Sequence, residues 1–315
     1  MRVGAEADCL TFDDLRISFH RTLRIPDDGR AYPLPPGLGG LPILRTAEYL
    51  DHLPGGSVGA DDFLIPMYQR EALWLGFDKD WPPVAISVAV GTVNAVSGRR
   101  QAPRPSTNPQ DYLVVPEQVW LDGINVGPAS VRQFVAMPLG RGYTVEGAIT
   151  GLETHGGIQI AVWPPRPGVV LERPPRRPPS APRARHAAAR MGLGAGGRIE
   201  QKIYPDPHGV DVWDVDHGAY ATIHIVNSDT YREITGRPPP PTPIDATTYT
   251  AHGLPWFEWY EEHAADVEAP ASLKEAKTVA ERDRELGLDP GDRSVDVDDA
   301  QVTRLRPPSD ERRRQ

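Results

Sequence analysis

Hydrophobic and polar residues alternate over long stretches in the first half of the chain. From Leu15 to Ile25 the apolar residues occupy every second position, and Arg21 is the one polar residue on that face. The stretch at 84–96, VAISVAVGTVNAV, places its larger apolar residues on one face and mostly small residues on the other. A period of two is typical of β-strands, because successive side chains point to opposite faces of a sheet. Both stretches are therefore predicted to form strands.

The same pattern recurs along the chain as far as residue 227. Further strands are predicted at 111–121, 131–139, 142–151, 157–163, 198–204 and 220–227. Strands that follow one another without intervening helices are typical of antiparallel sheets packed face to face. The predicted fold is mainly β, an antiparallel β-sandwich or jelly-roll-like core with a few peripheral C-terminal helices.

Helical signals are confined to the C-terminal third of the chain. Helices are predicted at 228–236, 255–266 and 273–286. Ser228 is a good N-cap and Gly236 a good residue to end the first of them. In the third, Ser272 and Glu275 form a potential capping box, and Gly287 follows the last turn. Its apolar stripe is thin, so we expect this helix to lie at the periphery.

Composition divides the chain into four segments. Residues 1–163 form the first part of a β-rich core, and residues 198–287 complete that core with strands and helices. Between them, 164–197 is rich in proline, arginine and glycine, and residues 164–190 alone hold eight prolines and seven arginines. Such a segment cannot bury a core, so a linker or an inserted loop is predicted. Residues 288–315 are charged and almost free of apolar residues, which predicts a disordered tail.

Charge and cysteine content limit the classes of partner and compartment. The net charge is −9, which disfavours nucleic acid as a general partner because phosphate binding needs a basic surface. The single cysteine, Cys9, excludes an intrachain disulfide and suits a reducing cytoplasm. The N-terminus lacks the apolar core of a signal peptide, and the 13-residue apolar run at 84–96 is too short to span a membrane. We therefore expect a cytoplasmic protein without a membrane span.

The densest group of chemically active side chains lies in residues 203–227, IYPDPHGVDVWDVDHGAYATIHIVN. Histidine and aspartate are common metal ligands, and one divalent metal is the only cofactor that the sequence suggests. The candidate ligands are His208, Asp211, Asp216, His217 and His224. Their spacing matches neither His-Glu-x-x-His nor an EF-hand loop. The alternative interpretation is a polar loop between two strands, with Asp-Pro and Gly placed there for their turn geometry.

Two segments are candidates for partner binding. Arg176 and Arg177 lie in the proline-rich strip, which either docks on an acidic or aromatic groove or serves as a solvated linker. Trp256 and Trp259 belong to the predicted helix at 255–266. Aromatic residues are enriched at interface anchors, but the same residues could instead complete the core.

The sequence evidence for a catalytic motif is weaker than that for the metal-binding and partner-binding candidates. The pattern Gly-x-Ser-x-Gly occurs at 55–59, GGSVG, but a nucleophile elbow also needs a strand before it and a helix after it, and neither is predicted there. Glu146 and Glu153 could supply the two carboxylates of a glycoside hydrolase, but that chemistry depends on a separation that sequence does not give.

Four blocks of sequence are similar to a family of uncharacterised bacterial proteins of an actinobacterial type. The blocks are FDDLRISFHRTLRIPDDGRAYPLPPGLG (12–39), RQFVAMPLGRGYTVEGAITG (132–151), PDPHGVDVWD (205–214) and PTPIDATTYTAHGLPWFEWYEE (241–262). This resemblance covers most of the chain outside 164–190 and the tail. It implies no activity and assigns no functional residue.

The leading functional hypothesis is a non-enzymatic structural or binding protein that acts through self-assembly or partner recognition. The first alternative is a metal-dependent hydrolase that uses the His/Asp loop at 206–224 and a metal-bound water. The second alternative is a binder of a small ligand or carbohydrate through exposed tryptophans.

Overall fold

The chain folds around one large, mostly antiparallel sheet. The computed structural model describes residues 1–6, 8–53, 58–172, 191–238, 241, 244–259, 265–291 and 293–305. In this part of the chain, 17 strands are linked by hydrogen bonds into a continuous sheet, and the helices are short. The predicted mainly-β fold is confirmed. None of the described helices is long and apolar enough to cross a membrane.

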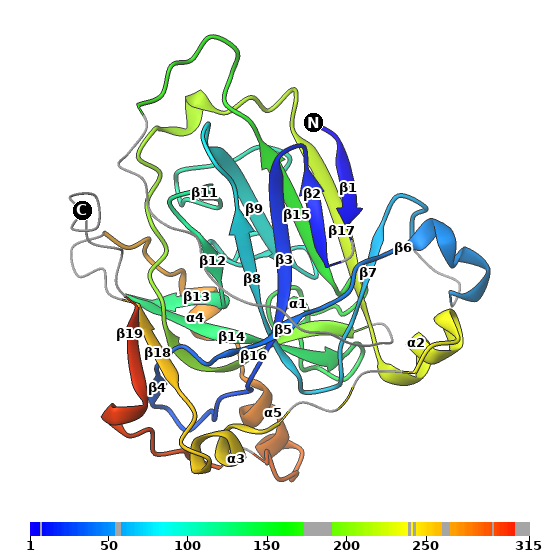
Figure 1. The fold of residues 1–315 in the computed structure, drawn as a ribbon, viewed down its shortest axis with the longest axis vertical. Coiled ribbons are helices and arrows are strands. Elements are labelled where there is room, and N and C mark those ends of the chain that lie inside the picture. The colour runs from blue at the N-terminus through cyan, green and yellow to red at the C-terminus, as the bar shows by residue number, and fades with distance from the viewer. Residues whose placement is uncertain are drawn as a thin grey trace, which may run out of the picture.

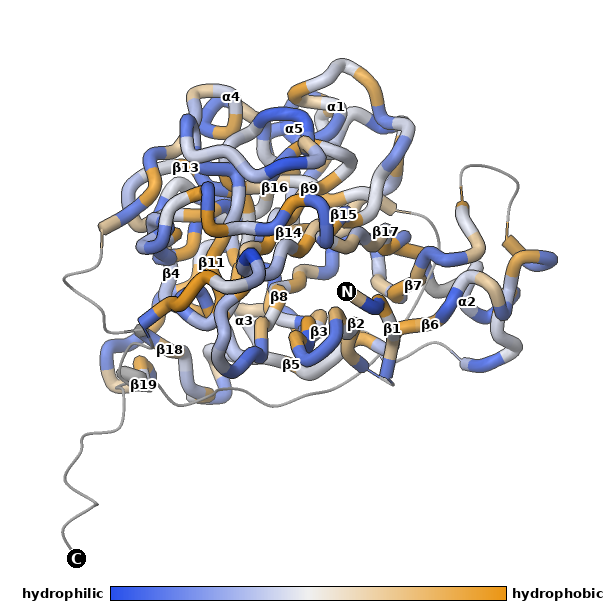
Figure 2. The backbone as a smooth tube through the Cα atoms, turned by 90° about the horizontal axis from the view of Figure 1, so that it is seen from above, coloured by the Kyte–Doolittle hydropathy of each residue, from blue (hydrophilic) through white to orange (hydrophobic). Residues whose placement is uncertain are grey.

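The sheet folds over into two layers (Figure 2). The strands of the first layer are β1 (Val3–Glu6), β2 (Cys9–Phe12), β3 (Leu15–Thr22), β8 (Ala72–Asp78), β14 (Ser130–Pro138), β16 (Met191–Glu200) and β4 (Ala31–Tyr32). Those of the second layer are β11 (Leu113–Val115), β9 (Val84–Val90), β15 (Ile158–Trp163), β17 (Ala219–Val226), β7 (Phe63–Pro66) and β6 (Leu44–Arg45). Figure 2 shows β1, β2, β3 and β8 opposite β9, β15 and β17 in a view from above. The two layers meet where Met191 of β16 pairs with Ile225 of β17.

Short strands and turns extend both layers (Figure 1). They are β5 (Gly37–Gly40), β10 (Val93–Asn94), β12 (Trp120–Leu121) and β13 (Gly123–Gly127), with the 3-10 turns η1 (Thr46–Glu48), η2 (Leu50–His52) and η3 (Val210–Val212). Strands β9 and β10 form a hairpin, so the stretch predicted as one strand at 84–96 reverses direction at Gly91 and Thr92. Both turn residues have positive φ.

The core lies between the layers, where the alternation seen in the sequence places it. Leu15, Ile17 and Phe19 of β3 are completely buried, in the same cluster as Ile86 of β9 and Ile160 of β15. Full burial of an aliphatic or aromatic side chain of this size stabilises a fold by about 1.5–3 kcal/mol. The period-two pattern therefore predicted correctly which face of β3 lies in the core.

The glycine-rich residues 191–197 belong to β16 and not to a linker, which corrects that part of the prediction. Strand β16 runs antiparallel to β14 along almost its whole length. A Cβ atom at Gly197 would lie 2.3 Å from the carbonyl oxygen of Pro26, and one at Gly194 would lie 2.8 Å from that of Tyr143. Glycine is needed here because neighbouring backbone packs directly on the strand. Residues 173–190 of the predicted linker lie outside the described residues.

The helices are α1 (Val145–Thr150), α2 (Ser228–Thr235), α3 (Ala246–Ala251), α4 (Ala271–Lys274) and α5 (Val279–Glu285). Helix α2 and the positive φ of Gly236 confirm the first predicted helix. The third is divided into α4 and α5, because the capping box is formed by Thr278 and Glu281 and starts a new helix there. Helix α1 replaces the strand predicted at 142–151, since the Thr144 side chain accepts the N–H of Gly147 as an N-cap.

The helix predicted at 255–266 is wrong within the described residues. Trp256–Trp259 form β18, which pairs in parallel with β19 (Val302–Leu305). Phe257 also exchanges two backbone hydrogen bonds with Leu34, at 2.7 and 2.9 Å. Consecutive aromatic residues favour a strand, and the pairing partners on both sides outweigh the helical spacing. Residues 260–264 lie outside the described part.

Structure continues into the range predicted as a disordered tail. Besides β19, the described residues of this range include the 3-10 turn η4 (Asp299–Gln301) and the buried side chain of Val295. The prediction is corrected for these residues, because a few apolar side chains suffice when strand β18 offers a pairing edge. Residues 306–315 lie outside the described residues.

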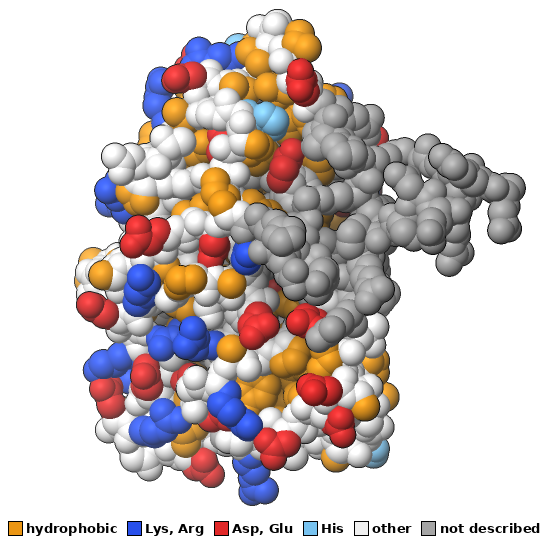
Figure 3. All heavy atoms as spheres, turned by 90° about the vertical axis from the view of Figure 1, so that its left-hand side faces the viewer, with side chains coloured by type: hydrophobic (Ala, Val, Ile, Leu, Met, Phe, Trp, Pro, Cys, Tyr) orange, Lys and Arg blue, Asp and Glu red, His pale blue; other side chains and the backbone are white. Residues whose placement is uncertain are grey.

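Charges of both signs occur on the face of the molecule in Figure 3. On the face in Figure 3, Lys and Arg side chains are interspersed with Asp and Glu side chains, without a continuous basic stripe among the described residues. Although the net charge of the sequence is −9, this face therefore carries both positive and negative side chains.

A buried ion pair fixes α5 to the outer face of the first layer. Asp283 is fully buried and accepts hydrogen bonds from both terminal nitrogens of Arg70, at 2.6 and 2.7 Å, and from the Tyr143 hydroxyl at 2.7 Å. Burial by itself would raise the pKa of Asp283, but these hydrogen bonds outweigh it and hold the pKa below its usual value. Helix α5, the segment before β8 and the segment before α1 are therefore joined through one carboxylate.

We expect Asp283→Asn to lower the free energy of unfolding by about 3–5 kcal/mol at neutral pH, because it removes one partner of a buried ion pair. Since the folded-state pKa of Asp283 is lowered, its contribution is present above the unfolded pKa of about 3.9 and is lost as the pH falls through the folded value. Urea unfolding at several pH values measures this difference. Asp51→Asn, at an exposed position of η2, is the control, and equal effects of the two substitutions would contradict the prediction.

Candidate functional site

The five predicted metal ligands do not converge in the structure. Nε2 of His224 lies 2.9 Å from Oδ2 of Asp62, and Nδ1 of His217 lies 2.8 Å from Oδ2 of Asp214. Nε2 of His208 faces Glu117 at 3.8 Å. Each of these histidines thus has a carboxylate partner of its own.

The two predicted aspartate ligands lie on the surface. Asp211 is exposed, and the Asp216 side chain is 79% exposed with Arg104 at 3.8 Å. Among the described residues, no group of three or more His, Cys, Asp or Glu side chains could hold a metal ion. The physical reason is the path of the chain, which spreads residues 206–224 along the whole length of β17 and the loop before it.

Residues 203–218 act instead as a polar loop that covers the outer face of the second layer. Trp213 is fully buried there beside Trp163 and Tyr112. Oδ2 of Asp206 accepts hydrogen bonds from the Tyr112 hydroxyl at 2.5 Å and from Nε1 of Trp213 at 3.0 Å. The ring of His208 packs edge-on against Trp213, with 6.0 Å between centroids. The described contacts therefore match the loop interpretation of this stretch.

The predicted partner-binding residues have separate outcomes. Trp256 is fully buried and its Nε1 donates to Oγ1 of Thr250 at 3.1 Å, so it completes the core as in the alternative interpretation. Trp259 belongs to β18, and its side chain lies outside the described atoms. Arg176 and Arg177 lie outside the described residues.

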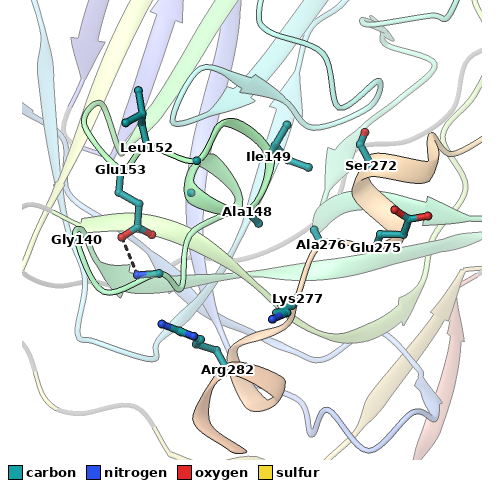
Figure 4. Close-up of a pocket in the computed structure, with 13 residues that line it drawn as sticks. Gly140, Ala148, Ile149, Leu152, Glu153, Ser272, Glu275, Ala276, Lys277 and Arg282 are labelled. Atoms are coloured by element: carbon teal, nitrogen blue, oxygen red, sulfur yellow. Dashed lines mark hydrogen bonds between the residues drawn. The ribbon is translucent and has the colours of Figure 1, made fainter. Parts of the chain in front are cut away.

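A groove on the described surface lies between α1 on one side and α4 and α5 on the other (Figure 4). It has a volume of about 830 Å³. Its lining consists of Gly140, Gly142, Gly147, Ala148, Ile149, Gly151, Leu152, Glu153, Ser272, Glu275, Ala276, Lys277 and Arg282. We call this feature the α1 groove.

The glycines and the apolar residues give the α1 groove its open shape. Leu152 is 63% exposed, although it carries a large apolar side chain. Gly140 and Gly142 both have positive φ, which lets the loop before α1 turn sharply under the helix. Apolar side chains exposed beside a concave surface are typical of binding sites.

Glu153 is held by the loop that forms the floor of the groove. Its carboxylate accepts the N–H of Gly142 at 2.8 Å, the N–H of Thr144 at 2.9 Å and the Thr144 hydroxyl at 2.5 Å. Burial alone would raise the pKa of Glu153, but these donors outweigh it and lower the pKa. Figure 4 shows the side chain turned toward this loop.

Glu146 plays the same part for the loop that follows α1. It is buried and accepts the N–H groups of Thr154, His155 and Gly156 at 2.9–3.3 Å, with Nδ1 of His155 at 2.8 Å. Burial would raise the pKa of Glu146, but the hydrogen bonds from Gly156 and His155 lower it overall. A carboxylate that is stabilised in its charged form is a poor general acid. Both glutamates therefore have structural partners in place of the glycosidase role considered from sequence.

Two cations stand on the opposite wall of the α1 groove. Nζ of Lys277 lies 2.5 Å from Oε1 of Glu285, and a terminal nitrogen of Arg282 lies 3.1 Å from Oε2 of the same residue. The hydrogen bonds from Lys277 and then Arg282 lower the pKa of Glu285. Nε of Arg282 is buried without a hydrogen-bond partner in the described part of the structure. Two positive side chains thus share one carboxylate at the groove.

The glycine content of the sequence indicates the turns around α1, which the period-two pattern alone did not predict. Four glycines occur between positions 140 and 151, and two glutamates that can accept backbone hydrogen bonds lie in or beside this stretch. Glycines so closely spaced argue against the strand predicted at 142–151 and for a turn-rich segment. The cationic wall comes from residues more than a hundred positions away, so its contribution depended on the fold.

We expect Glu146→Gln to lower the free energy of unfolding by about 3 kcal/mol, because an amide replaces a buried carboxylate that accepts several backbone N–H groups. The amides of Thr154, His155 and Gly156 should exchange hydrogen faster in this variant. Hydrogen exchange read by mass spectrometry and urea unfolding measure the two effects. Glu275→Gln makes the same chemical change at an exposed position of the groove and should leave these amides protected; unchanged exchange in Glu146→Gln would refute the assigned role.

We expect His208→Ala and His217→Ala to leave the metal content of the purified chain unchanged, because the described ligands do not converge. Elemental analysis per chain is the measurement. Stoichiometric zinc, iron or manganese that disappears in both variants would contradict this expectation and restore the metal site.

Comparison of the chain with protein-family models, curated proteins and solved structures finds no match. Any functional conclusion therefore rests on the geometry of the chain itself, and the α1 groove is the feature of the described surface that best fits a binding role.

Proposed function

We propose that this protein is a non-enzymatic binding protein and that the α1 groove is its partner-binding site. The observation that carries the proposal is the combination of an 830 Å³ hollow with an exposed Leu152 on one wall and the cations Lys277 and Arg282 on the other. Interfaces typically combine a central apolar contact with a polar rim that gives orientation. The groove offers both within one surface.

The state of the reactive side chains supports binding over catalysis. Cys9 is buried in β2, so its thiol does not face a substrate site. Glu146 and Glu153 are held as carboxylates by backbone donors, and the histidines of the 203–227 stretch each face a separate carboxylate. The Ser18 hydroxyl does lie 2.7 Å from Nε2 of His20, but His20 is buried and its ring stacks on Trp74. As part of the same proposal we place the protein in a reducing cytoplasm, which suits a chain with one cysteine.

The two alternative functions have less support. A metal-dependent hydrolase needs ligands that converge, and the described His and Asp candidates are spread over the loop and strand. A carbohydrate binder needs exposed aromatic faces, whereas Trp163, Trp213 and Trp256 are fully buried and Trp74, Trp81 and Trp120 are partly buried. Neither alternative is favoured by a specific contact.

We expect Ala148→Trp to abolish partner binding, because Ala148 is exposed on α1 and a tryptophan there would fill the groove. Tagged wild-type protein and variants are used to capture partners from the source cells, and the captured proteins are quantified by mass spectrometry. Capture should fall at least about tenfold, equivalent to ~1.4 kcal/mol.

Leu50→Asp serves as the matched control, because Leu50 is an exposed apolar residue of η2 outside the groove lining. Its captured set should equal that of the wild-type protein. If Ala148→Trp captures the same proteins in the same amounts, the groove is not the binding site.

A further inference from the structure

A short apolar tip follows β15 and is the most exposed apolar feature among the described residues. Val170 is 93% exposed and its neighbour Val169 is 40% exposed. A turn precedes them, in which the N–H of Val169 donates to the carbonyl of Arg166 at 3.2 Å and Gly168 has a φ of +83°. Figure 1 shows this segment as the green loop that projects beyond the ends of the strands. We call residues 169–172 the apolar tip.

The chemistry of the apolar tip is complementary to that of the α1 groove. The tip ends in Glu172, an exposed carboxylate two residues after Val170. In an extended chain these two side chains lie on the same side, about 6.6 Å apart, so both can enter one groove. The groove offers Leu152 for the apolar contact, and Lys277 with Arg282 for the carboxylate.

The charge balance of the groove favours an acidic occupant on its cationic side. Lys277 and Arg282 share the single carboxylate of Glu285, which leaves one net positive charge at that point. Glu153 is turned toward its own loop donors. Glu275 lies beside Ser272 on α4, whereas Arg282 projects from α5 toward the loop before α1 (Figure 4). A second carboxylate placed between the two cations would therefore be attracted, at the end of the groove away from Glu275.

We propose that the α1 groove of one copy of this protein binds the apolar tip of a second copy, with Val170 against the α1 wall and Glu172 between Lys277 and Arg282. This inference rests on the binding role proposed for the groove and names its occupant. The two surfaces differ, so reciprocal insertion produces a closed dimer, whereas one-way insertion produces an open chain of copies. Either product is larger than one chain in solution.

The experiment is a charge-swap cycle in the full-length protein, followed by sedimentation velocity over a range of concentrations. The wild-type protein should self-associate reversibly. Glu172→Lys alone and the double variant Lys277→Glu with Arg282→Glu should each weaken self-association about tenfold or more, because like charges then face one another. Combining all three substitutions should restore most of it, since the opposite charges are paired again.

Val170→Asp should also abolish self-association, and Leu50→Asp should leave it unchanged. Thermal unfolding of every variant confirms folding, and recovery in the combined variant excludes general damage as the cause of the losses.

A wild-type protein that stays monomeric at every concentration, or a combined variant that does not recover, overturns this proposal. The proposed function fails separately, when Ala148→Trp has no effect on captured proteins. If the wild-type protein is monomeric while Ala148→Trp still loses a captured protein, the groove binds a different partner and only the identity of the occupant is wrong.

Discussion

The α1 groove depends on two carboxylates that satisfy the backbone of the loops around α1. Buried N–H groups must be paired, because an unpaired one costs the free energy of a lost hydrogen bond. Glu153 accepts the N–H groups of the loop before the helix, and Glu146 accepts those of the loop after it. A six-residue helix is too short to be stable alone. The glutamates therefore hold both ends of α1 in place, and α1 forms one wall of the groove.

The opposite wall is held by a different interaction, the buried pair of Asp283 with Arg70. It fixes α5 on the first layer, and α5 in turn carries Arg282. Tyr143 donates to the same carboxylate, so the segment that leads into α1 is bound to it as well. The two walls of the groove are thus coupled through charged groups that have little exposure, which favours a preformed surface over one that orders on binding.

The stretch at 203–227 shows how local composition can suggest chemistry that the fold does not assemble. Its aspartates and histidines resemble a ligand set when they are viewed along the chain. In the structure, Asp206 pairs with Tyr112 and Trp213, while His224 faces Asp62 across neighbouring strands. Tyr112 and Asp62 come from distant segments of the chain, and the loop closes the outer face of the second layer. Polar residues are needed there because the loop is anchored on one side and exposed on the other.

Local pattern determined the two-layer β-fold and the core face of β3, because a strand's alternation is a property of neighbouring residues. The end of α2 was likewise marked in the sequence by Gly236, which has positive φ. The conformation of Trp256–Trp259 was decided by tertiary structure, since it needs β19 as a partner, which sequence spacing does not reveal. The groove also depends on tertiary structure. Its walls come together only when Asp283 pairs with Arg70, which lies 213 positions away in the sequence.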